Sequence, residues 1–369
     1  MKVGILTFHN AYNYGAVLQT YATQEYVRGL GHEVEVIDYH NRKIDLSYEN
    51  RKFRLRSFLR NSYIFPLYLL EKYYYWKRRK AYRIFFEKYI SLSSNRYEQD
   101  DKIFLGDYDV VLIGSDQLWN KKLTGGLDAI YWGQFETRPT TRIAAWSVCM
   151  NYMVLTETEK DTIKSYLSNF TAISVREDEL QNFISKLTTQ EVHLTLDPTL
   201  LLTRTQWTAL CRPIKEKGYV VVYAVRKEKE TVEFARKIAE KQGKPLVILR
   251  PYSNWYFTKE NKEYGGPVEF LSYINNADMV VTSSFHGTVF SYIFHKQFIC
   301  PILDGNVRVE NLLRILGLRE RMVESWNDAL NLSTIDYSKV SKTFEAKREE
   351  TKEYLNSLLS GAISVDEAN

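Results

Sequence analysis

The segment Met279–Thr288, with the sequence MVVTSSFHGT, decides how the chain is interpreted, because an apolar run stops abruptly in small hydroxyl residues. The pattern predicts a buried strand, a tight turn and a helix that begins near His286. The N-terminus of a helix presents backbone N–H groups and the positive end of the helix dipole, so this turn can bind an anion. Ser283 and Ser284 add hydroxyl donors, and Gly287 lets a ligand approach the backbone. His286 can transfer a proton near neutral pH, although the same pattern is also typical of an ordinary helix cap beside a packed histidine.

The sequence around this segment alternates between strand and helix along most of the chain. Strands are predicted at 3–8, 33–38, 108–113, 142–148, 172–175, 219–224, 246–249, 278–281 and 298–301. Helices are predicted at 16–30, 157–169, 229–242, 268–275 and 341–359. The step Asp197–Pro198 ends regular structure between two such series. We therefore expect an α/β protein with two Rossmann-like domains facing a cleft that holds the active site.

The predicted domain boundary lies near residue 203. The expected parts are an N-terminal Rossmann-like domain at 1–203 with a helical insertion at about 45–105, a C-terminal Rossmann-like domain at 204–340, and a helix and tail at 341–369. A chain of 369 residues has room for about two domains of ordinary size.

Composition indicates a soluble globular protein, with 44% hydrophobic and 26% charged residues. The net charge of +5 does not by itself indicate a nucleic-acid partner, and we expect none. Cys149, Cys211 and Cys300 are far apart and form no metal-binding pattern, which predicts free thiols in a reducing compartment. The sequence lacks the apolar segment of a signal peptide or a transmembrane helix, so we expect a cytoplasmic protein.

Residues 51–90 contain twelve lysines and arginines and two glutamates, interleaved with aromatic residues. One interpretation is a basic, aromatic helical insertion that contacts the anionic inner surface of a membrane. The other is a helical hairpin whose aromatic side chains pack inward and whose cations are solvated. The second interpretation is slightly favoured, because the segment has no clean apolar face.

Two loops that follow predicted strands are candidates for binding an acceptor. Gly114–Asn120, GSDQLWN, places a carboxylate, two amides and an indole after a buried strand, a combination suited to a sugar. The loop His9–Gly15 lacks the pattern GxGxxG, so a dinucleotide is not indicated, and it is either a ligand loop or a simple turn.

Five motifs together resemble the polysaccharide pyruvyl transferase family. They are NYGAVLQ at 13–19, GSDQLWN at 114–120, ISVRE at 173–177, DPTLL at 197–201 and SFHG at 284–287. They occur in order and span most of the chain. The resemblance implies a fold similar to GT-B glycosyltransferases and transfer of pyruvate from phosphoenolpyruvate to a saccharide, forming a ketal and releasing phosphate.

The resemblance also implies roles for individual residues. Arg176 and His286 match residues at the phosphoenolpyruvate site of the family. The family often has an arginine where this chain has Ser284, and Arg226 or Arg308 could replace its charge. The segment 146–150 also departs from the family's usual Ser-Phe-Gly.

From these motifs we predict the following roles. His286 is the general acid and Asp116 is the base or the residue that orients a hydroxyl. Phosphoenolpyruvate is held by Arg176, Ser283, Ser284, Phe285, Gly287 and Arg226 or Arg308. The acceptor side contains His9, Asn13, Tyr14, Gln117, Trp119 and Asn120.

The expected partners are phosphoenolpyruvate as donor and a saccharide acceptor, lipid-linked or not. No metal site and no cofactor are expected. Two alternatives stay open, namely a GT-B glycosyltransferase that uses a nucleotide-sugar and a non-catalytic saccharide-binding protein of the same fold.

Overall fold

The computed structural model describes residues 1–49, 65–150, 154–225, 228–249, 261–263, 265–302, 307–340 and 342–362. The chain forms two compact units. Unit 1 comprises Met1–Arg51, Phe86–Leu202 and Ala346–Asn369, and unit 2 comprises Lys52–Phe85 and Thr203–Glu345. Each unit therefore includes a segment that the sequence assigned elsewhere, because 52–85 belongs to unit 2 and 346–369 belongs to unit 1.

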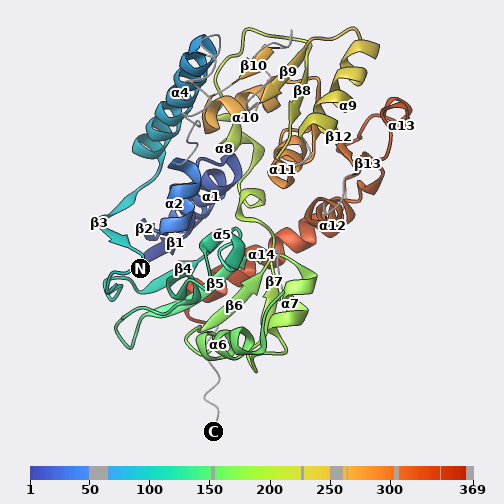
Figure 1. The fold of residues 1–369 in the computed structure, drawn as a ribbon. Coiled ribbons are helices and arrows are strands. Elements are labelled where there is room, and N and C mark those ends of the chain that lie inside the picture. The colour runs from blue at the N-terminus through green and yellow to red at the C-terminus, as the bar shows by residue number, and fades with distance from the viewer. Residues whose placement is uncertain are drawn as a thin grey trace. The chain divides into compact units, whose positions relative to one another are not determined.

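Unit 1 is built on a seven-stranded parallel sheet with the order β3-β2-β1-β4-β5-β6-β7 (Figure 1). Its strands are β1 Lys2–Leu6, β2 Glu33–His40, β3 Leu92–Glu98, β4 Val110–Ile113, β5 Arg142–Val148, β6 Ala172–Val175 and β7 Val192–Leu194. All four residues of β4 and of β6 are buried. Such uninterrupted burial is typical of central parallel strands that are covered on both faces.

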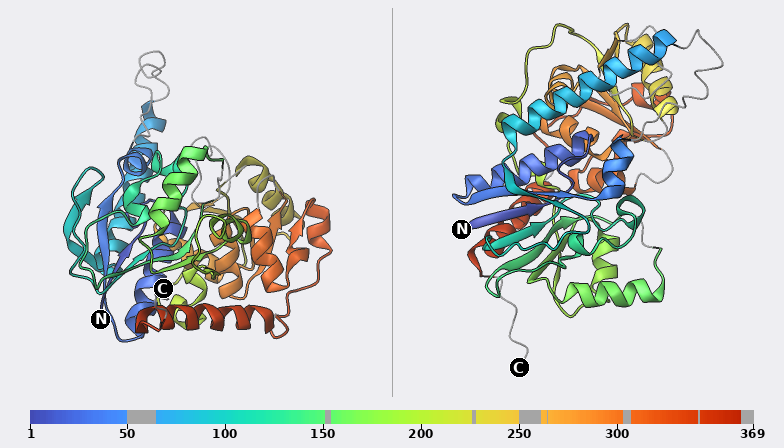
Figure 2. Two further views of the ribbon diagram at one scale, coloured as in Figure 1. Left: turned by 90° about the horizontal axis from the view of Figure 1, so that it is seen from below. Right: turned by 60° about the vertical axis from the view of Figure 1, so that its left-hand side comes forward.

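The helices of unit 1 connect these strands. They are α1 Tyr14–Gly29, α2 Arg42–Glu49, α5 Lys121–Thr124, α6 Glu157–Leu167 and α7 Asp178–Ile184, with short 3-10 turns η2 Ala129–Trp132 and η3 Pro198–Leu200. The last helix, α14 Lys342–Ser360, is continuous (Figure 2). Its residues Leu355, Leu358 and Leu359 are buried, and Arg142 donates a hydrogen bond to the carbonyl of Leu359 at 2.9 Å. These contacts fix the C-terminal part of α14 on unit 1.

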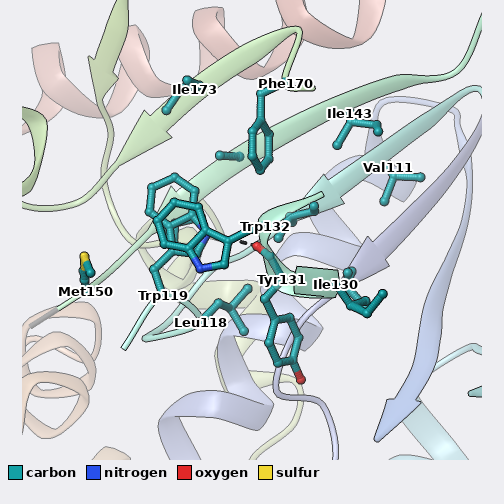
Figure 3. Close-up of a cluster of buried hydrophobic side chains, with 14 of the residues drawn as sticks. Val111, Leu118, Trp119, Ile130, Tyr131, Trp132, Ile143, Met150, Phe170 and Ile173 are labelled. Atoms are coloured by element: carbon teal, nitrogen blue, oxygen red, sulfur yellow. Dashed lines mark hydrogen bonds between the residues drawn. The ribbon is translucent and has the colours of Figure 1, made fainter. Parts of the chain in front are cut away.

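A group of stacked aromatic rings lies in the core of unit 1 (Figure 3). The rings of Trp119 and Trp132 stack with centroids 4.2 Å apart, and Phe170 packs edge-on against Trp119. The indole N–H of Trp119 donates to the carbonyl of Tyr131 at 2.9 Å. Trp119 is 1% exposed, so its ring has no face available to a sugar.

Unit 2 repeats the same architecture with a six-stranded sheet in the order β10-β9-β8-β11-β12-β13, again parallel (Figure 1). Its strands are β8 Val220–Tyr223, β9 Leu246–Leu249, β10 Asn261–Glu263, β11 Met279–Thr282, β12 Gln297–Pro301 and β13 Met322–Val323. Its helices are α8 Arg204–Thr208, α9 Glu228–Lys241, α10 Pro267–Asn276, α11 Phe285–Ile293, α12 Val307–Leu316 and α13 Trp326–Leu330, with the 3-10 turn η5 Arg319–Arg321. The prediction of two Rossmann-like α/β domains is confirmed.

Helix α4, Phe65–Tyr89, provides most of the described part of the basic, aromatic segment. Tyr82 and Phe85 are buried, and Lys77 pairs with Glu263 of unit 2 at 3.7 Å. The exposed residues recur every three or four positions and thus form one face of the helix. They are Leu69, Lys72, Tyr73, Trp76, Lys77, Lys80, Arg83, Ile84, Glu87 and Lys88.

The expected helical insertion at 45–105 is wrong from Leu92 onward, because β3 is the edge strand of the first sheet and pairs with β2, whereas α4 is helical up to Tyr89. Its sequence, LSSNRYE, has no apolar alternation, since most of this strand is exposed. The strands β7, β10 and β13 were not predicted either, because they are too short for a pattern that needs four or more apolar residues.

Trp119→Ala should lower the free energy of unfolding by about 3–5 kcal/mol, because it removes a buried ring and leaves a cavity in the aromatic stack. Urea unfolding followed by circular dichroism measures the change. Leu123→Ala on α5 is the control, since Leu123 is 42% exposed and its truncation should change stability by less than about 0.5 kcal/mol. Equal stability of the Trp119→Ala protein and the wild type would contradict the core assignment.

Candidate functional site

Most of the predicted site residues that the structure describes follow strands at which the sheet changes the direction in which strands are added. In unit 1 the chain first extends the sheet from β1 to β2 and then returns to place β4 on the other side of β1. In unit 2, β8 has β9 on one side and β11 on the other. The loops that follow β1 and β4, and those that follow β8 and β11, therefore diverge at the carboxyl edge. Open α/β sheets bind ligands at this position.

A chain of buried hydrogen bonds fixes the loops at the carboxyl edge of the first sheet. Gln19 of α1 donates to the hydroxyl of Thr7 at 2.8 Å and accepts from the N–H of Ser115 at 3.1 Å. The Ser115 hydroxyl donates to the carbonyl of Ser147 at 2.8 Å. All four side chains are fully buried. Gln19, which the sequence did not single out as a site residue, thus links the ends of β1 and β4 from the helix between them.

The loop after β4 has an unusual backbone. Gly114 has φ of 137°, and a Cβ atom at this position would lie 1.9 Å from the carbonyl oxygen of Trp146, so only glycine fits. Asp116 in this loop and Ser147 in the neighbouring strand β5 have φ values of 81° and 48°, in the left-handed region that few side chains adopt. Strained residues of this kind cluster at functional sites, which favours the loop as part of one.

A buried ion pair lies beside this loop. Arg176 follows β6 and pairs with Asp197, which follows β7, and its second terminal nitrogen lies 3.5 Å from Oδ1 of Asp116. The side chains of Arg176 and Asp197 are 5% and 0% exposed. Burial disfavours the charged guanidinium, but the attraction of Asp197 and Asp116 dominates and keeps the pKa of Arg176 above its ordinary value. Arg176 is therefore a permanent cation held by two carboxylates.

Asp197 is a site residue that sequence reasoning missed, although its motif was noted. Its Oδ1 accepts hydrogen bonds from the N–H and the hydroxyl of Thr199, at 2.9 and 2.5 Å, so the carboxylate is fixed on the side away from Arg176 as well. An aspartate directly before a proline, at a step predicted to end regular structure, was the available signal.

Several residues predicted on the acceptor side make contacts that stabilise the fold. Asn13 caps α1 by accepting from the N–H of Gly15 at 3.0 Å, and Asn120 caps α5 by accepting from Lys122 at 3.1 Å. Tyr14 and Trp119 are buried, each 1% exposed. Gln117 accepts from the Asn120 amide at 2.8 Å and is partly exposed. Asp116 and Gln117 are thus the accessible polar side chains of the Gly114–Asn120 motif.

His9 belongs to a polar cluster at the ends of β1 and β2. Its Nε2 lies 2.8 Å from Oδ1 of Asp38, and Nε2 of His40 lies 2.9 Å from the same oxygen. Burial raises the pKa of Asp38, but the hydrogen bonds from His40 and His9 outweigh it and the pKa lies below its ordinary range. Hydrogen bonds to Asp38 and Asp45 raise the pKa of His40 to about 9. The spacing of Asp38 and His40 at a strand end was a signal for this cluster.

In unit 2 the turn between β11 and α11 has the predicted form. Ser284 caps α11 and accepts from the N–H of Gly287 at 3.4 Å, and the Thr288 hydroxyl donates back to the carbonyl of Ser284 at 3.0 Å. Thr282 donates to the carbonyl of Tyr223 in β8 at 2.6 Å. A Cβ atom on Gly287 would lie 2.1 Å from the Thr282 hydroxyl oxygen. Gly287 is therefore required for close packing of helix on strand, which differs from the expected role of exposing backbone to a ligand.

The predicted histidine lies in the first turn of this helix. His286 is 8% exposed, and its ring stands edge-on to Phe285 with centroids 5.2 Å apart. The guanidinium carbon of Arg308, in the first turn of α12, lies 5.9 Å from the centre of the Phe285 ring. Unit 2 thus brings Ser284, Phe285, His286 and Arg308 together. Arg226 follows β8 in the sequence but lies outside the described residues.

The two sheets, with helices between successive strands, define the GT-B type of α/β fold. A UDP-GlcNAc 2-epimerase from Methanocaldococcus jannaschii matches with a TM-score of 0.56 and 11% identity, over 98% of this chain and 100% of that one. A structure of the M. jannaschii enzyme in complex with UDP-GlcNAc and UDP matches with a TM-score of 0.54 and 12% identity, over the same shares. An alpha-glucosyltransferase in complex with UDP and DNA has a TM-score of 0.50 and 10% identity, over 98% of this chain and 99% of that one. Identities this low establish the fold alone.

The model of the family described as polysaccharide pyruvyl transferase matches residues 13–301, and the chain belongs to this family. The resemblance of the five motifs is thereby confirmed. A search of curated proteins finds no match.

Asp197→Ala should destabilise the protein by about 3–5 kcal/mol, because it leaves the buried Arg176 cation without its main partner. Asp107→Ala is the matched control, since the Asp107–Arg138 pair is 69% and 60% exposed and its loss should cost less than about 1 kcal/mol. Urea unfolding of both variants measures the difference. Similar costs for the two substitutions would contradict the electrostatic role of Asp197.

Proposed function

We propose that this protein transfers the pyruvyl group of phosphoenolpyruvate to two hydroxyls of a saccharide, forming a ketal and releasing phosphate. Membership of the pyruvyl transferase family indicates the transferred group. The observation that carries the choice of donor is the turn Ser283–His286, which combines a helix N-terminus, two hydroxyls, a histidine and the nearby Arg308 at the point where the second sheet changes direction. These groups suit a doubly anionic donor.

In this proposal Arg308 supplies the cation that the family often has at the position of Ser284. Its guanidinium is near Phe285 and hence near the turn, and its planar fork can bind a phosphate or a carboxylate through two hydrogen bonds. Arg226 stays the other candidate.

The reaction moves two protons, because each of the two acceptor hydroxyls loses one, the enol methylene gains one and the released phosphate gains the other. Protonation of the enol methylene gives a cationic carbon, which one sugar hydroxyl attacks. The second hydroxyl then displaces phosphate from the same carbon, and the two hydroxyl protons are balanced by the new methyl hydrogen and by phosphate. We assign the protonation to His286 and the orientation or deprotonation of an acceptor hydroxyl to Asp116.

Arg176 supports this role of Asp116 through its position. Its guanidinium lies 3.5 Å from Oδ1 of Asp116 and pairs with Asp197, so it can hold the Asp116 carboxylate in place. Direct binding of phosphoenolpyruvate by Arg176, which the family resemblance implies, stays a prediction.

Two variants separate proton transfer from anion binding. His286→Gln should lower kcat for phosphate release by about 100-fold or more, because it removes the general acid. Arg308→Gln should instead raise KM for phosphoenolpyruvate about tenfold, the effect of losing one charge-assisted hydrogen bond. Phosphate release and the mass gain of the glycan, measured against phosphoenolpyruvate concentration with a panel of acceptors, give both constants.

His295→Asn is the control for this assay, because His295 is an exposed histidine beyond the end of α11 with φ of 54°, which asparagine tolerates. Near wild-type phosphate release by His286→Gln would contradict the catalytic assignment.

Thermal stabilisation by a nucleotide-sugar, with none by phosphoenolpyruvate, would instead favour a glycosyltransferase.

We further propose that helix α4 brings the protein to a membrane that carries a lipid-linked acceptor. Leu69, Tyr73, Trp76 and Ile84 are each about half exposed and lie on the same face as five cations. Lys80 lies over the Trp76 ring at 5.1 Å. A face of aromatic, aliphatic and basic side chains suits the interface of an anionic membrane. Within the described residues, no helix is long and apolar enough to cross a bilayer.

The combined variant Tyr73→Ser, Trp76→Ser and Lys80→Gln should weaken binding to phosphatidylserine vesicles about tenfold or more, because it removes interfacial rings and a charge. Vesicle flotation measures binding, and turnover on a soluble acceptor should be unchanged. The control Lys229→Gln with Lys241→Gln removes two exposed charges from α9 and should leave flotation unaffected. Wild-type flotation of the α4 variant would reject the membrane role.

A further inference from the structure

We propose that His9, Asp38 and His40 bind one divalent transition-metal ion at the carboxyl edge of the first sheet, in place of the metal-free site that the sequence predicts. His9 follows β1, while Asp38 and His40 are in the last three residues of β2, the strand that pairs with β1. Asp38 and His40 are two residues apart, so both side chains point to the same face of the strand. One ligand atom of each residue lies within 4.8 Å of the other two.

The rings are oriented as metal ligands usually are. Both Nε2 atoms converge on Oδ1 of Asp38, at 2.8 and 2.9 Å. The other nitrogen of each ring faces an acceptor, since Nδ1 of His40 lies 2.7 Å from Asp45 and Nδ1 of His9 lies 3.4 Å from the carbonyl of Thr7. Outer contacts of this kind fix the ring and leave Nε2 to the metal.

The acceptor that orients His40 is itself held by a hydrogen bond. Asn10 donates a hydrogen bond to Oδ1 of Asp45 at 2.6 Å, which holds the carboxylate that orients His40. The side chains of His9, Asp38 and His40 are 2%, 19% and 13% exposed, so the ligands are packed in place but can be reached. The site is therefore preorganised by the fold.

The donor set indicates the class of ion. Two imidazoles and one carboxylate suit zinc, iron, cobalt or nickel, whereas magnesium and calcium prefer oxygen ligands alone. The charge of +2 balances the carboxylates of Asp38 and Asp45. Tetrahedral zinc needs ligand atoms about 3.4 Å apart, so each contact must widen by about half an ångström, which side-chain rotation can supply. Three protein ligands leave a position for an oxygen of water or of a sugar.

The competing interpretation is a hydrogen-bonded histidine–aspartate–histidine cluster without metal, and direct binding measurements separate the two. Tag-free, full-length protein is stripped with EDTA, freed of the chelator and titrated with Zn²⁺ by calorimetry, and with Co²⁺ by visible absorption. We expect one saturable site per chain for both ions and none for Mg²⁺. His9→Gln and His40→Gln should each weaken Zn²⁺ binding by about tenfold or more, since each removes a ligand.

His193→Gln is the matched control, because Nε2 of His193 also faces a carboxylate, that of Glu191 at 3.6 Å, outside the cluster. It should bind Zn²⁺ like the wild type. Wild-type protein without a saturable site, or equal affinity in the wild type and the two ligand variants, would overturn the proposal. If a ligand variant does not fold, Asp45→Asn, which leaves all three ligands intact, should still weaken binding about tenfold, and unchanged affinity overturns it. None of these measurements depends on transferase activity.

Discussion

The carboxyl ends of parallel strands all lie at one edge of a sheet, and this constraint determines which residues of the chain can meet. In unit 1 it places residues from four strand ends, up to about 190 residues apart in sequence, at the same edge of the sheet, namely His9, Asp116, Arg176 and Asp197. In unit 2 the same constraint places Ser283 and His286 after β11, beside the end of β8. The helices that return the chain to the amino edge need no chemistry of their own, so the polar residues concentrate where the strands end.

Polar groups at a sheet edge are stable only when partners replace water, and unit 1 supplies them through two separate systems. Gln19 connects the backbone and hydroxyls after β1 and β4, while Asp197 neutralises Arg176. A buried cation without its partner is costly, so the pair fixes the ends of β6 and β7 as well. Asp116 lies next to both systems, with its carbonyl bound by the N–H of Cys149 at 3.0 Å and its carboxylate near Arg176. This double attachment can hold a strained φ.

The sequence predicts the strands that are buried on both faces of a sheet. It does not predict the role of a side chain when that role depends on its contacts in the folded protein. Runs such as Val110–Ile113 and Met279–Thr282 are short, apolar and rich in β-branched residues, which is typical of strands in a parallel sheet covered on both faces. The polar edge strand Leu92–Glu98 carries no such signal. Trp119, Asn13 and Asn120 have the side chains of a sugar site, but the indole completes an aromatic stack and the amides cap helices. Amides and indoles serve both purposes, and only the three-dimensional neighbours distinguish them.

The family often has an arginine at the position of Ser284, and in this chain the serine caps the helix that follows. A serine at this position accepts the N–H of Gly287 and caps α11, a contribution of about 1 kcal/mol that an arginine side chain cannot make. At the proposed donor site, this chain therefore has a helix cap where the family resemblance implies a cation. Arg308 lies in the first turn of α12, where the helix dipole disfavours a positive charge, yet its guanidinium is near Phe285. In the proposed function, an anionic donor that binds both Arg308 and the N-terminus of α11 would stabilise this cation. The position of Arg308 would then cost stability in the free protein and favour binding of the donor.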